Sequence, residues 1–304
     1  MAQQFAQLSD PHLTSLANVR LPDLLSKRAL GYLSWRRKRR HEHRREVLDA
    51  LQRDLAHEPV EQILITGDLT HIGLPEEFKE ARDWLRQLGT PDQIALVPGN
   101  HDACVDAPWD ATYALWREYM APDADSGVAG SSAEFPTLRV RGEIAFIGLS
   151  TAVPTPPLLA TGTAGREQLE RLAALLRDTA RRSLFRVIYL HHCPLARHEK
   201  WRKRLTDAPA LEAVLKEYGA ELVVHGHGHR SHYRTLATRD GVAPVIAVPS
   251  ASALGRYGAH RASYNRYAVQ RNPRGWILEI DSRRYNDARG EFEAVESSRF
   301  DMER

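Results

Sequence analysis

The 304-residue chain has few cysteines and no long apolar segment. Its two cysteines, Cys104 and Cys193, can form at most one disulfide, which argues against a disulfide-stabilised secreted scaffold and favours a reducing compartment. No stretch approaches the roughly 20 apolar residues of a membrane-spanning helix. Residues 1–8 lack the basic start of a signal peptide. These absences predict a soluble, cytoplasmic protein.

An excess of positive charge occurs in one segment only. Between Lys27 and Arg45 there are nine Lys or Arg residues and a single acid, Glu42, so this segment carries +8. The rest of the chain carries −5, because the net charge of the whole is +3. Such a local surplus indicates a local purpose and argues against a wholly basic nucleic-acid-binding protein.

Short apolar runs alternate with helical patterns along the chain. Amphipathic spacing predicts helices over 35–56, 75–88, 169–176 and 211–218. Strands are predicted over 5–8, 63–66, 94–97, 137–140, 144–149, 185–190, 222–224, 245–248, 267–270 and 276–280. This order predicts an α/β fold of two packed sheets with helices outside. We expect one domain over 1–281 and a polar surface tail over 282–304.

Five short motifs follow apolar runs that predict buried strands. They are Asp10-Pro11-His12, Gly67-Asp68, Gly99-Asn100-His101-Asp102, His191-His192 and Gly226-His227-Gly228-His229. Each alone is weak evidence, since Gly-Asp at a strand end is often only a turn or a helix cap. Ligands at strand ends of an α/β fold converge in one crevice, so we expect these residues to meet. Carboxylate, amide and imidazole donors suit Mn²⁺, Fe²⁺ or Zn²⁺.

The ordered set of motifs resembles that of the calcineurin-like metallophosphoesterases, over about Phe5 to Ser252. The resemblance implies a four-layer αββα sandwich of two mixed sheets flanked by helices. It also implies two divalent metal ions, about 3.5–4 Å apart, with a bridging hydroxide that attacks a phosphoester. By motif position, the first metal would be held by Asp10, His12, Asp68 and His229, and the second by Asp68, Asn100, His191 and His227.

The same resemblance assigns catalytic roles beside the metals. His101 would face the substrate and protonate the leaving oxygen or steady the phosphoryl group, and Asp102 would orient His101. His192 leaves its strand opposite to His191, so we expect it behind the ligands, although an exchange of their roles stays open. The two cysteines are expected to be small buried packing residues.

The residues around the motifs favour one branch of that family. The Asp-Arg-Gly continuation of Ser/Thr protein phosphatases is missing after Asp68, and His71 stands where purple acid phosphatases have a tyrosine ligand. Asp10-Pro11-His12 and the His191-His192-Cys193-Pro194 run resemble class III cyclic-nucleotide and glycerophosphodiester phosphodiesterases. We therefore expect metal-dependent hydrolysis of a small phosphodiester or a related phosphoester.

Residues 13–45, here called the basic insert, depart from that family pattern. Within 21–45 lie Leu, Tyr and Trp residues beside the basic run. Four interpretations stay open: a membrane-surface anchor, a cap on the active site that binds an anionic substrate, a contact with nucleic acid, and a solvated basic helix start whose apolar residues pack on the body. Since the insert directly follows Asp10-Pro11-His12, we expect it near the mouth of the site.

Three further alternatives stay open. A membrane-surface pyrophosphohydrolase acting on a lipid-linked nucleotide would resemble the UDP-diacylglucosamine hydrolases, although those commonly have Arg in place of His101. A noncatalytic scaffold on the same fold is disfavoured, because such relatives typically lose metal ligands. The hairpin and the last strands offer a face for a homodimer, but no sequence feature requires one.

Overall fold

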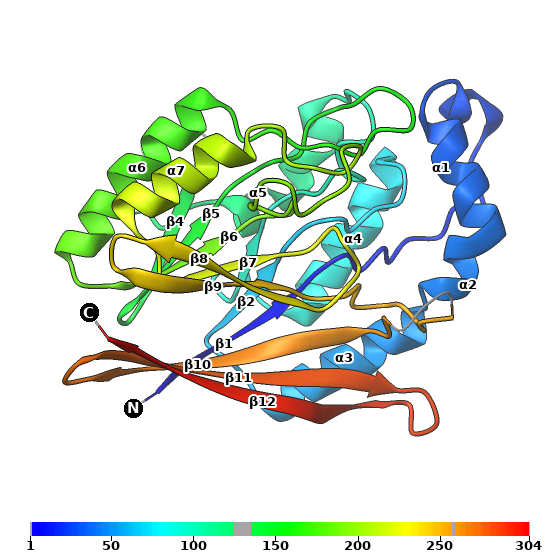
Figure 1. Ribbon diagram of the computed structural model, residues 1–304. Coiled ribbons are helices and arrows are strands. Elements are labelled where there is room, and N and C mark those ends of the chain that lie inside the picture. Colours follow the sequence, from blue (N-terminus) through cyan, green and yellow to red (C-terminus); the bar gives the residue numbers. More distant parts are fainter. Residues whose placement is uncertain (1, 125–134, 257–259, 304) are drawn as a thin grey trace.

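The structure, a computed structural model, describes residues 2–124, 135–256 and 260–303. In these ranges two six-stranded sheets pack face to face, with helices on their outer sides (Figure 1). The strand order is β12-β11-β10-β1-β2-β3 in the first sheet and β4-β5-β6-β7-β9-β8 in the second. The αββα sandwich expected from the sequence is confirmed.

The first sheet combines parallel and antiparallel strands. Its parallel part is β1 (Gln3–Leu8), β2 (Gln62–Ile65) and β3 (Ile94–Leu96). Its antiparallel part is β10 (Ser263–Asn272), β11 (Gly275–Asn286) and β12 (Glu291–Glu303). The parallel strands carry their carboxyl ends to one edge, which is where the first three sequence motifs begin.

The second sheet is also mixed. Strands β5 (Ile144–Gly148), β6 (Phe185–Tyr189), β7 (Leu222–His225) and β9 (Gly241–Ala247) run parallel. Strands β4 (Thr137–Arg141) and β8 (His232–Thr238) are its antiparallel edges. The expected hairpin of β4 and β5 is confirmed, whereas β8 was missed because its residues are mostly exposed and polar.

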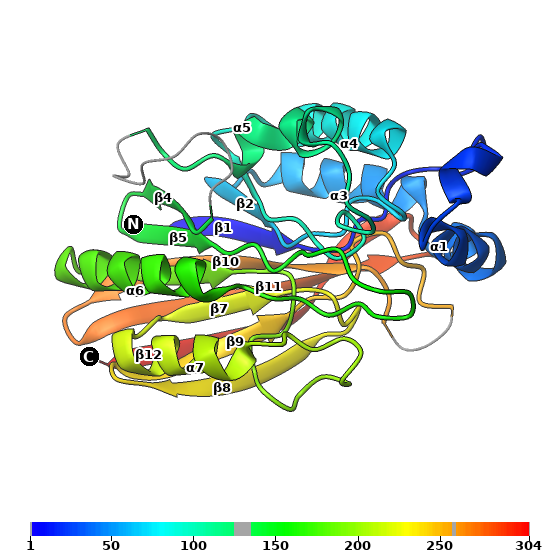
Figure 2. The same cartoon turned by 90° about the horizontal axis from the view of Figure 1, so that it is seen from above.

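Helices cover both outer faces. Helices α3 (Arg45–His57) and α4 (Pro75–Leu88) pack on the first sheet through one apolar cluster. Helices α6 (Arg166–Arg181) and α7 (Ala208–Tyr218) pack on the second. Figure 2 shows α3 and α4 at one side of the molecule and α7 at the other. A third cluster lies between the sheets, where Phe5 stacks on Tyr267 at 4.7 Å and meets the edge of Phe146.

The prediction of a polar tail over 282–304 is wrong. Residues 282–286 end β11, and β12 pairs with β11 from Asn286↔Glu291 to Gly275↔Glu303. β12 is an edge strand whose residues are mostly exposed, so its sequence needs little apolar character. Its Phe292 is nevertheless buried against the α3 side of the sheet.

The helix predicted over 35–56 is interrupted. The basic insert contains α1 (Arg28–Ser34), a π-turn (Trp35–Arg39) and α2 (Arg40–Glu42), preceded by a 3₁₀ turn (Leu21–Leu24). His43 and Arg44 are extended, because His43 bridges to Ala253 and the Arg44 N–H donates to the Ser252 carbonyl. These tertiary contacts override the helical pattern and separate α2 from α3.

The remaining helices are short and lie between β3 and β4. They are the 3₁₀ turns Trp109–Ala111 and Tyr113–Trp116, followed by α5 (Arg117–Met120). Across the described ranges, no helix has both the length and the apolar character needed to cross a membrane.

Candidate metal centre

Loops after β1, β2, β3, β6 and β7 meet at one end of the sandwich. The Asp10 N–H donates to the Gly67 carbonyl at 2.9 Å, and the Gly226 N–H donates to the His191 carbonyl at 3.0 Å. The two sheets are joined there by the His227 N–H, which donates to Oδ2 of Asp10 at 3.0 Å. The strand-end motifs therefore form one continuous wall.

The backbone of this wall is unusual. Eight non-glycine residues of the described chain have positive φ, and five of them are predicted ligands: Asp10, His12, Asp68, His227 and His229. A side chain held in the left-handed region costs on the order of 1–3 kcal/mol, and such strain gathers at functional sites. The fold thus holds these five side chains in orientations that relaxed loops would avoid.

One cluster contains Asp10, His12, Asp68 and His229, with one ligand atom of each within 4.8 Å of the others. Nε2 of His229 lies 3.2 Å from Oδ1 of Asp10 and 3.4 Å from Nε2 of His12. Nε2 of His12 is 4.0 Å from Oδ2 of Asp68. The structure therefore brings together all four residues expected at the first metal.

A second cluster adjoins the first across Asp68. Nε2 of His191 lies 3.4 Å from Oδ2 of Asp68 and 3.1 Å from Oδ1 of Asn100. Nδ1 of His227 is 3.2 Å from the same His191 nitrogen. The four residues expected at the second metal are thus also neighbours, and Asp68 is the residue shared by both clusters.

His192 lies closer to this second cluster than the sequence indicated. One donor atom each of His191, His192 and His227 lies within 4.8 Å of the others. Nδ1 of His192 is 2.8 Å from the Thr151 hydroxyl, whereas its Nε2 is buried without a hydrogen-bond partner. Both histidines of the pair therefore reach the cluster, with their rings nearly perpendicular.

Several buried donor atoms of the site have no hydrogen-bond partner. They include Oδ1 of Asp10, Nε2 of His192 and Nε2 of His227. A buried polar atom without a partner is costly, and a divalent cation satisfies carboxylate and imidazole lone pairs together. These residues therefore fit metal ions for two reasons. Their donor atoms are of the kinds that divalent metals bind, and several of those atoms have no hydrogen-bond partner.

Burial and neighbouring charges set the protonation of the residues in both clusters. Burial alone would raise the pKa of Asp68, but His191 and other histidines hold it well below its usual value. The same Asp68 carboxylate outweighs the effect of burial on His191 and raises its pKa to about 9. Burial lowers the pKa of His12 and His227 well below the ordinary value, which favours the neutral imidazole that binds metals.

His101 is oriented by a backbone carbonyl. Its Nδ1 lies 2.6 Å from the His71 carbonyl oxygen, which fixes the ring plane. Two guanidinium nitrogens of Arg39 lie 3.0 and 2.9 Å from Nδ1 and Nε2 of the same ring. Burial and the charge of Arg39 lower the pKa of His101 to about 3, so the ring is neutral.

Asp102 does not orient His101 as expected. Its carboxylate accepts hydrogen bonds at 2.9 Å from the backbone N–H groups of Asp68, Thr70 and Gly99. It also accepts the Thr70 hydroxyl at 3.0 Å. Asp102 therefore joins the loop after β2 to the loop after β3 and positions two segments that carry expected ligands.

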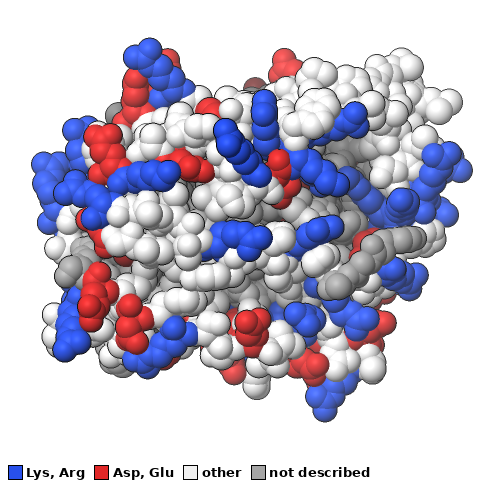
Figure 3. Space-filling model, in the orientation of Figure 1, with Lys and Arg blue, Asp and Glu red and all other residues white. Residues whose placement is uncertain are grey.

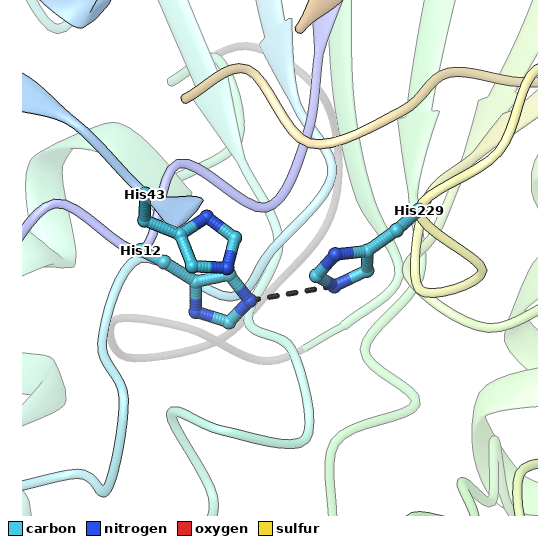
Figure 4. A group of neighbouring side chains, drawn as sticks. All are labelled: His12, His43 and His229. Atoms are coloured by element: carbon cyan, nitrogen blue, oxygen red, sulfur yellow. Dashed lines mark hydrogen bonds between the residues drawn. The ribbon is translucent and has the colours of Figure 1, made fainter. Parts of the chain in front are cut away.

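The basic insert supplies two residues that the sequence did not single out. Arg39 contacts His101, and His43 lies against the first cluster, with ring centroids 4.6 Å from His12 and 5.8 Å from His229 (Figure 4). Nδ1 of His43 is 2.9 Å from the Ser252 hydroxyl. Neither residue belongs to a recognisable sequence motif. The only sequence evidence for these contacts was that the insert directly follows Asp10-Pro11-His12.

Comparison with known proteins agrees with this geometry. The family model for calcineurin-like phosphoesterases matches residues 4–231. A 3',5'-cyclic-nucleotide phosphodiesterase of Nostoc sp. is 27% identical over 234 residues, which cover 75% of this chain and 72% of that protein.

Two solved structures share the fold at low identity. A dimetal phosphatase from Danio rerio aligns with a TM-score of 0.52 and 12% identity, over 97% of this chain and 99% of that one. The NAD nucleotidase of Haemophilus influenzae aligns with a TM-score of 0.51 and 13% identity, over 97% of this chain and 54% of that one. The chain belongs to the calcineurin-like phosphoesterase family and is a phosphoester hydrolase.

Proposed function

We propose that this protein hydrolyses a small phosphodiester with the help of two divalent metal ions. The observation that carries the proposal is the convergence of seven predicted ligands from five loops into two clusters that share Asp68. The 27% identical relative named as a cyclic-nucleotide phosphodiesterase supports the diester class.

The residues present suit two ions of Mn²⁺, Fe²⁺ or Zn²⁺. Asp10, His12, Asp68 and His229 would hold one, and Asp68, Asn100, His191 and His227 the other. Bound there, the ions would make a water acidic enough to attack phosphorus and would offset the negative charge of the phosphoryl oxygens. Oδ2 of Asp68 lies beside both clusters, 4.0 Å from Nε2 of His12 and 3.4 Å from Nε2 of His191, and its Oδ1 accepts the His101 backbone N–H at 2.7 Å. His191 would hold a metal as the neutral imidazole, so metal binding there would release its proton.

His101 is the proposed acid for the leaving oxygen. With Nδ1–H held by the His71 carbonyl, Nε2 is the nitrogen that can exchange its 2.9 Å contact with Arg39 for a ligand. An anionic phosphoryl group beside the ring favours protonation at Nε2, because an adjacent negative charge raises the pKa of an imidazole. The proton then passes from Nε2 to the departing alcohol oxygen.

A second candidate substrate is favoured by the outer surface of the insert. Leu21, Leu25, Leu30 and Leu33 are 81, 88, 45 and 41% exposed, and the same insert carries the exposed cations of residues 36–38. Apolar and basic side chains together suit an anionic lipid surface, so a lipid-linked nucleotide remains the alternative. Co-flotation with anionic liposomes favours this alternative, and no flotation favours a small diester.

We also propose a cytoplasmic location, on the observation that Cys104 and Cys193 are both buried and unbridged. A noncatalytic scaffold is disfavoured, since the chain carries all seven expected ligands.

The test is hydrolysis by metal-reconstituted protein. Apo protein is loaded separately with Mn²⁺, Fe²⁺, Zn²⁺ or Mg²⁺ and offered bis(p-nitrophenyl) phosphate, p-nitrophenyl phosphate and 3',5'-cyclic AMP. We expect metal-dependent cleavage of the diester that exceeds cleavage of the monoester. Cleavage of the monoester alone would replace this proposal with a phosphatase. Inactivity on all three substrates with metal bound would contradict the small-diester proposal.

A further inference from the structure

Arg39 is a half-buried cation whose partners are unusual for an arginine. Two of its guanidinium nitrogens lie 3.0 and 2.9 Å from the two ring nitrogens of His101, and within residues 2–124, 135–256 and 260–303 it has no ion pair. Two arginines that are buried, Arg186 and Arg139, are satisfied by oxygen. Arg186 contacts the carboxylates of Glu221 and Asp240 at 2.7 Å, and Arg139 donates to backbone carbonyls. Among the described residues, Arg39 is thus a positive charge at the site that forms no ion pair with a carboxylate.

This arrangement leaves unused binding capacity. A guanidinium has five N–H donors in a planar fork that matches the oxygens of a carboxylate or a phosphate. A neutral imidazole can accept at only one nitrogen, and Nδ1 of His101 is already directed at the His71 carbonyl. Removing a charge from water without an anion is costly, so an anionic ligand at this position gains more than it would at the surface.

The insert holds Arg39 in place from both sides. Before it, Lys27 donates to the Leu159 carbonyl at 2.8 Å, and Trp35 is only 8% exposed in an apolar cluster. After it, the Glu42 carboxylate accepts the backbone N–H groups of Gly255 at 2.7 Å and Arg256 at 3.2 Å. A guanidinium fixed in this way loses little side-chain freedom when it binds an anion.

The neighbouring cations of the insert face elsewhere. Arg36, Arg37 and Lys38 are exposed, whereas Arg39 is half-buried. In Figure 3, which has the orientation of Figure 1, Lys and Arg side chains gather toward the α2 end of the insert, and the surface around α1 is mostly uncharged. Arg39 is therefore distinguished from the general basic surface by its direction and by its contact with His101.

We propose that Arg39 binds a non-bridging oxygen of the phosphoryl group beside His101, exchanging the imidazole for the oxygens of the substrate. The inference rests on the proposed function and adds to it a substrate-binding residue that comes from the insert and from none of the strand-end motifs. The ligand class is a phosphate-ester anion or the phosphate product that shares its charged oxygens.

Inorganic phosphate binding to the Mn²⁺-loaded full chain tests this assignment, by calorimetric titration. Arg39→Ala should weaken the affinity about 10- to 100-fold, the range for hydrogen bonds to charged groups. Arg39→Lys should recover part of it, because a lysine keeps the charge and loses the fork. Arg37→Ala removes the same charge from the exposed side of the turn and should leave the affinity within about twofold.

The readouts separate this inference from the proposed function. Metal content and thermal midpoint should match wild type in every variant, and Arg39→Gln serves as a second neutral variant if Arg39→Ala fails to fold. Equal phosphate affinity in Arg39→Ala and wild type, or no phosphate binding by loaded wild type, overturns the inference. Arg39-dependent phosphate binding in a protein that cleaves no diester would overturn the proposed function and leave the binding residue assigned.

Discussion

The strand-end loops and the basic insert face the same site but are built by different means. The loops are short, follow directly from sheet strands and hold Asp10, His12 and Asp68 fully buried with positive φ. The insert has no strand of its own and is held by side-chain contacts and a short backbone bridge at His43. Arg39 and His43 reach the site half-buried. In this molecule the proposed metal ligands come from the loops of the sheets, and further site contacts come from an added segment.

The comparison separates two kinds of dependence. Loss of an expected ligand in the loops should remove metal, and activity with it. Loss of an insert residue should leave the metals in place and weaken substrate binding or lower turnover. Each variant below is therefore measured for metal content as well as for turnover.

The largest effect is expected for Asp68→Asn. The shared carboxylate supplies an oxygen to both clusters, and its loss should lower diester turnover by at least about 1,000-fold, equivalent to several kcal/mol of transition-state stabilisation. Metal analysis should show that the variant binds fewer ions per chain. Asp49→Asn, at an exposed ion pair with Arg45, is the control and should keep wild-type diester turnover and metal content. Full metal content in Asp68→Asn would argue against a shared ligand.

His101→Ala should come next. Removal of an acid for the leaving oxygen should cost about 100-fold in kcat, at the low end of general acid catalysis. Metal content should stay unchanged, since His101 belongs to neither cluster. The exposed His57 gives a matched control, His57→Ala. A variant that loses metal as well as turnover would place His101 among the ligands.

Asp102→Asn tests the corrected role of this carboxylate. An amide cannot accept at both ends, so backbone donors of Asp68, Thr70 or Gly99 lose their partner. Partners of this kind typically change metal affinity or activity by about 10- to 100-fold. We expect weaker metal binding and a lower thermal midpoint. A loss confined to kcat, with metal affinity intact, would restore the idea that Asp102 acts on His101.

The smallest effect is expected for Glu42→Gln in the insert. Loss of the charged acceptor for Gly255 and Arg256 should loosen the insert and lower kcat/KM by about 3- to 10-fold, since the half-exposed carboxylate is partly screened by water. Metal content should not change. Glu46→Gln, at an exposed ion pair with Arg44, should behave like wild type. Loss of metal in Glu42→Gln would contradict the view that the loops hold the metals and the insert does not.

The fold was largely predictable because strand ends carry their own signals. Apolar runs such as 63–66 and 185–190 place β2 and β6, and parallel strands bring their carboxyl ends to one edge. Seven expected ligands lie together for this reason. β12 was missed because an exposed edge strand needs no apolar period, and the break at His43 was missed because it is set by Ser252 and Ala253, over 200 residues away.

Part of the site was also unpredictable because its contacts join residues that are far apart in the sequence. The contact of Arg39 with His101 depends on how the insert folds back, which no local spacing encodes. The partners of Asp102 are backbone N–H groups, and these leave no trace in the side-chain sequence. Motifs report which residues gather at strand ends, whereas tertiary contacts decide what each one touches.

The number and spacing of bound Mn²⁺ ions test the central claim most directly. Apo protein is titrated with Mn²⁺ while its electron paramagnetic resonance spectrum and metal stoichiometry are followed. Two clusters that share Asp68 predict two ions per chain, about 3.5–4 Å apart, with a spin-coupled spectrum that is lost in Asp68→Asn. A single uncoupled ion per chain, or the same spectrum in wild type and Asp68→Asn, would contradict the account.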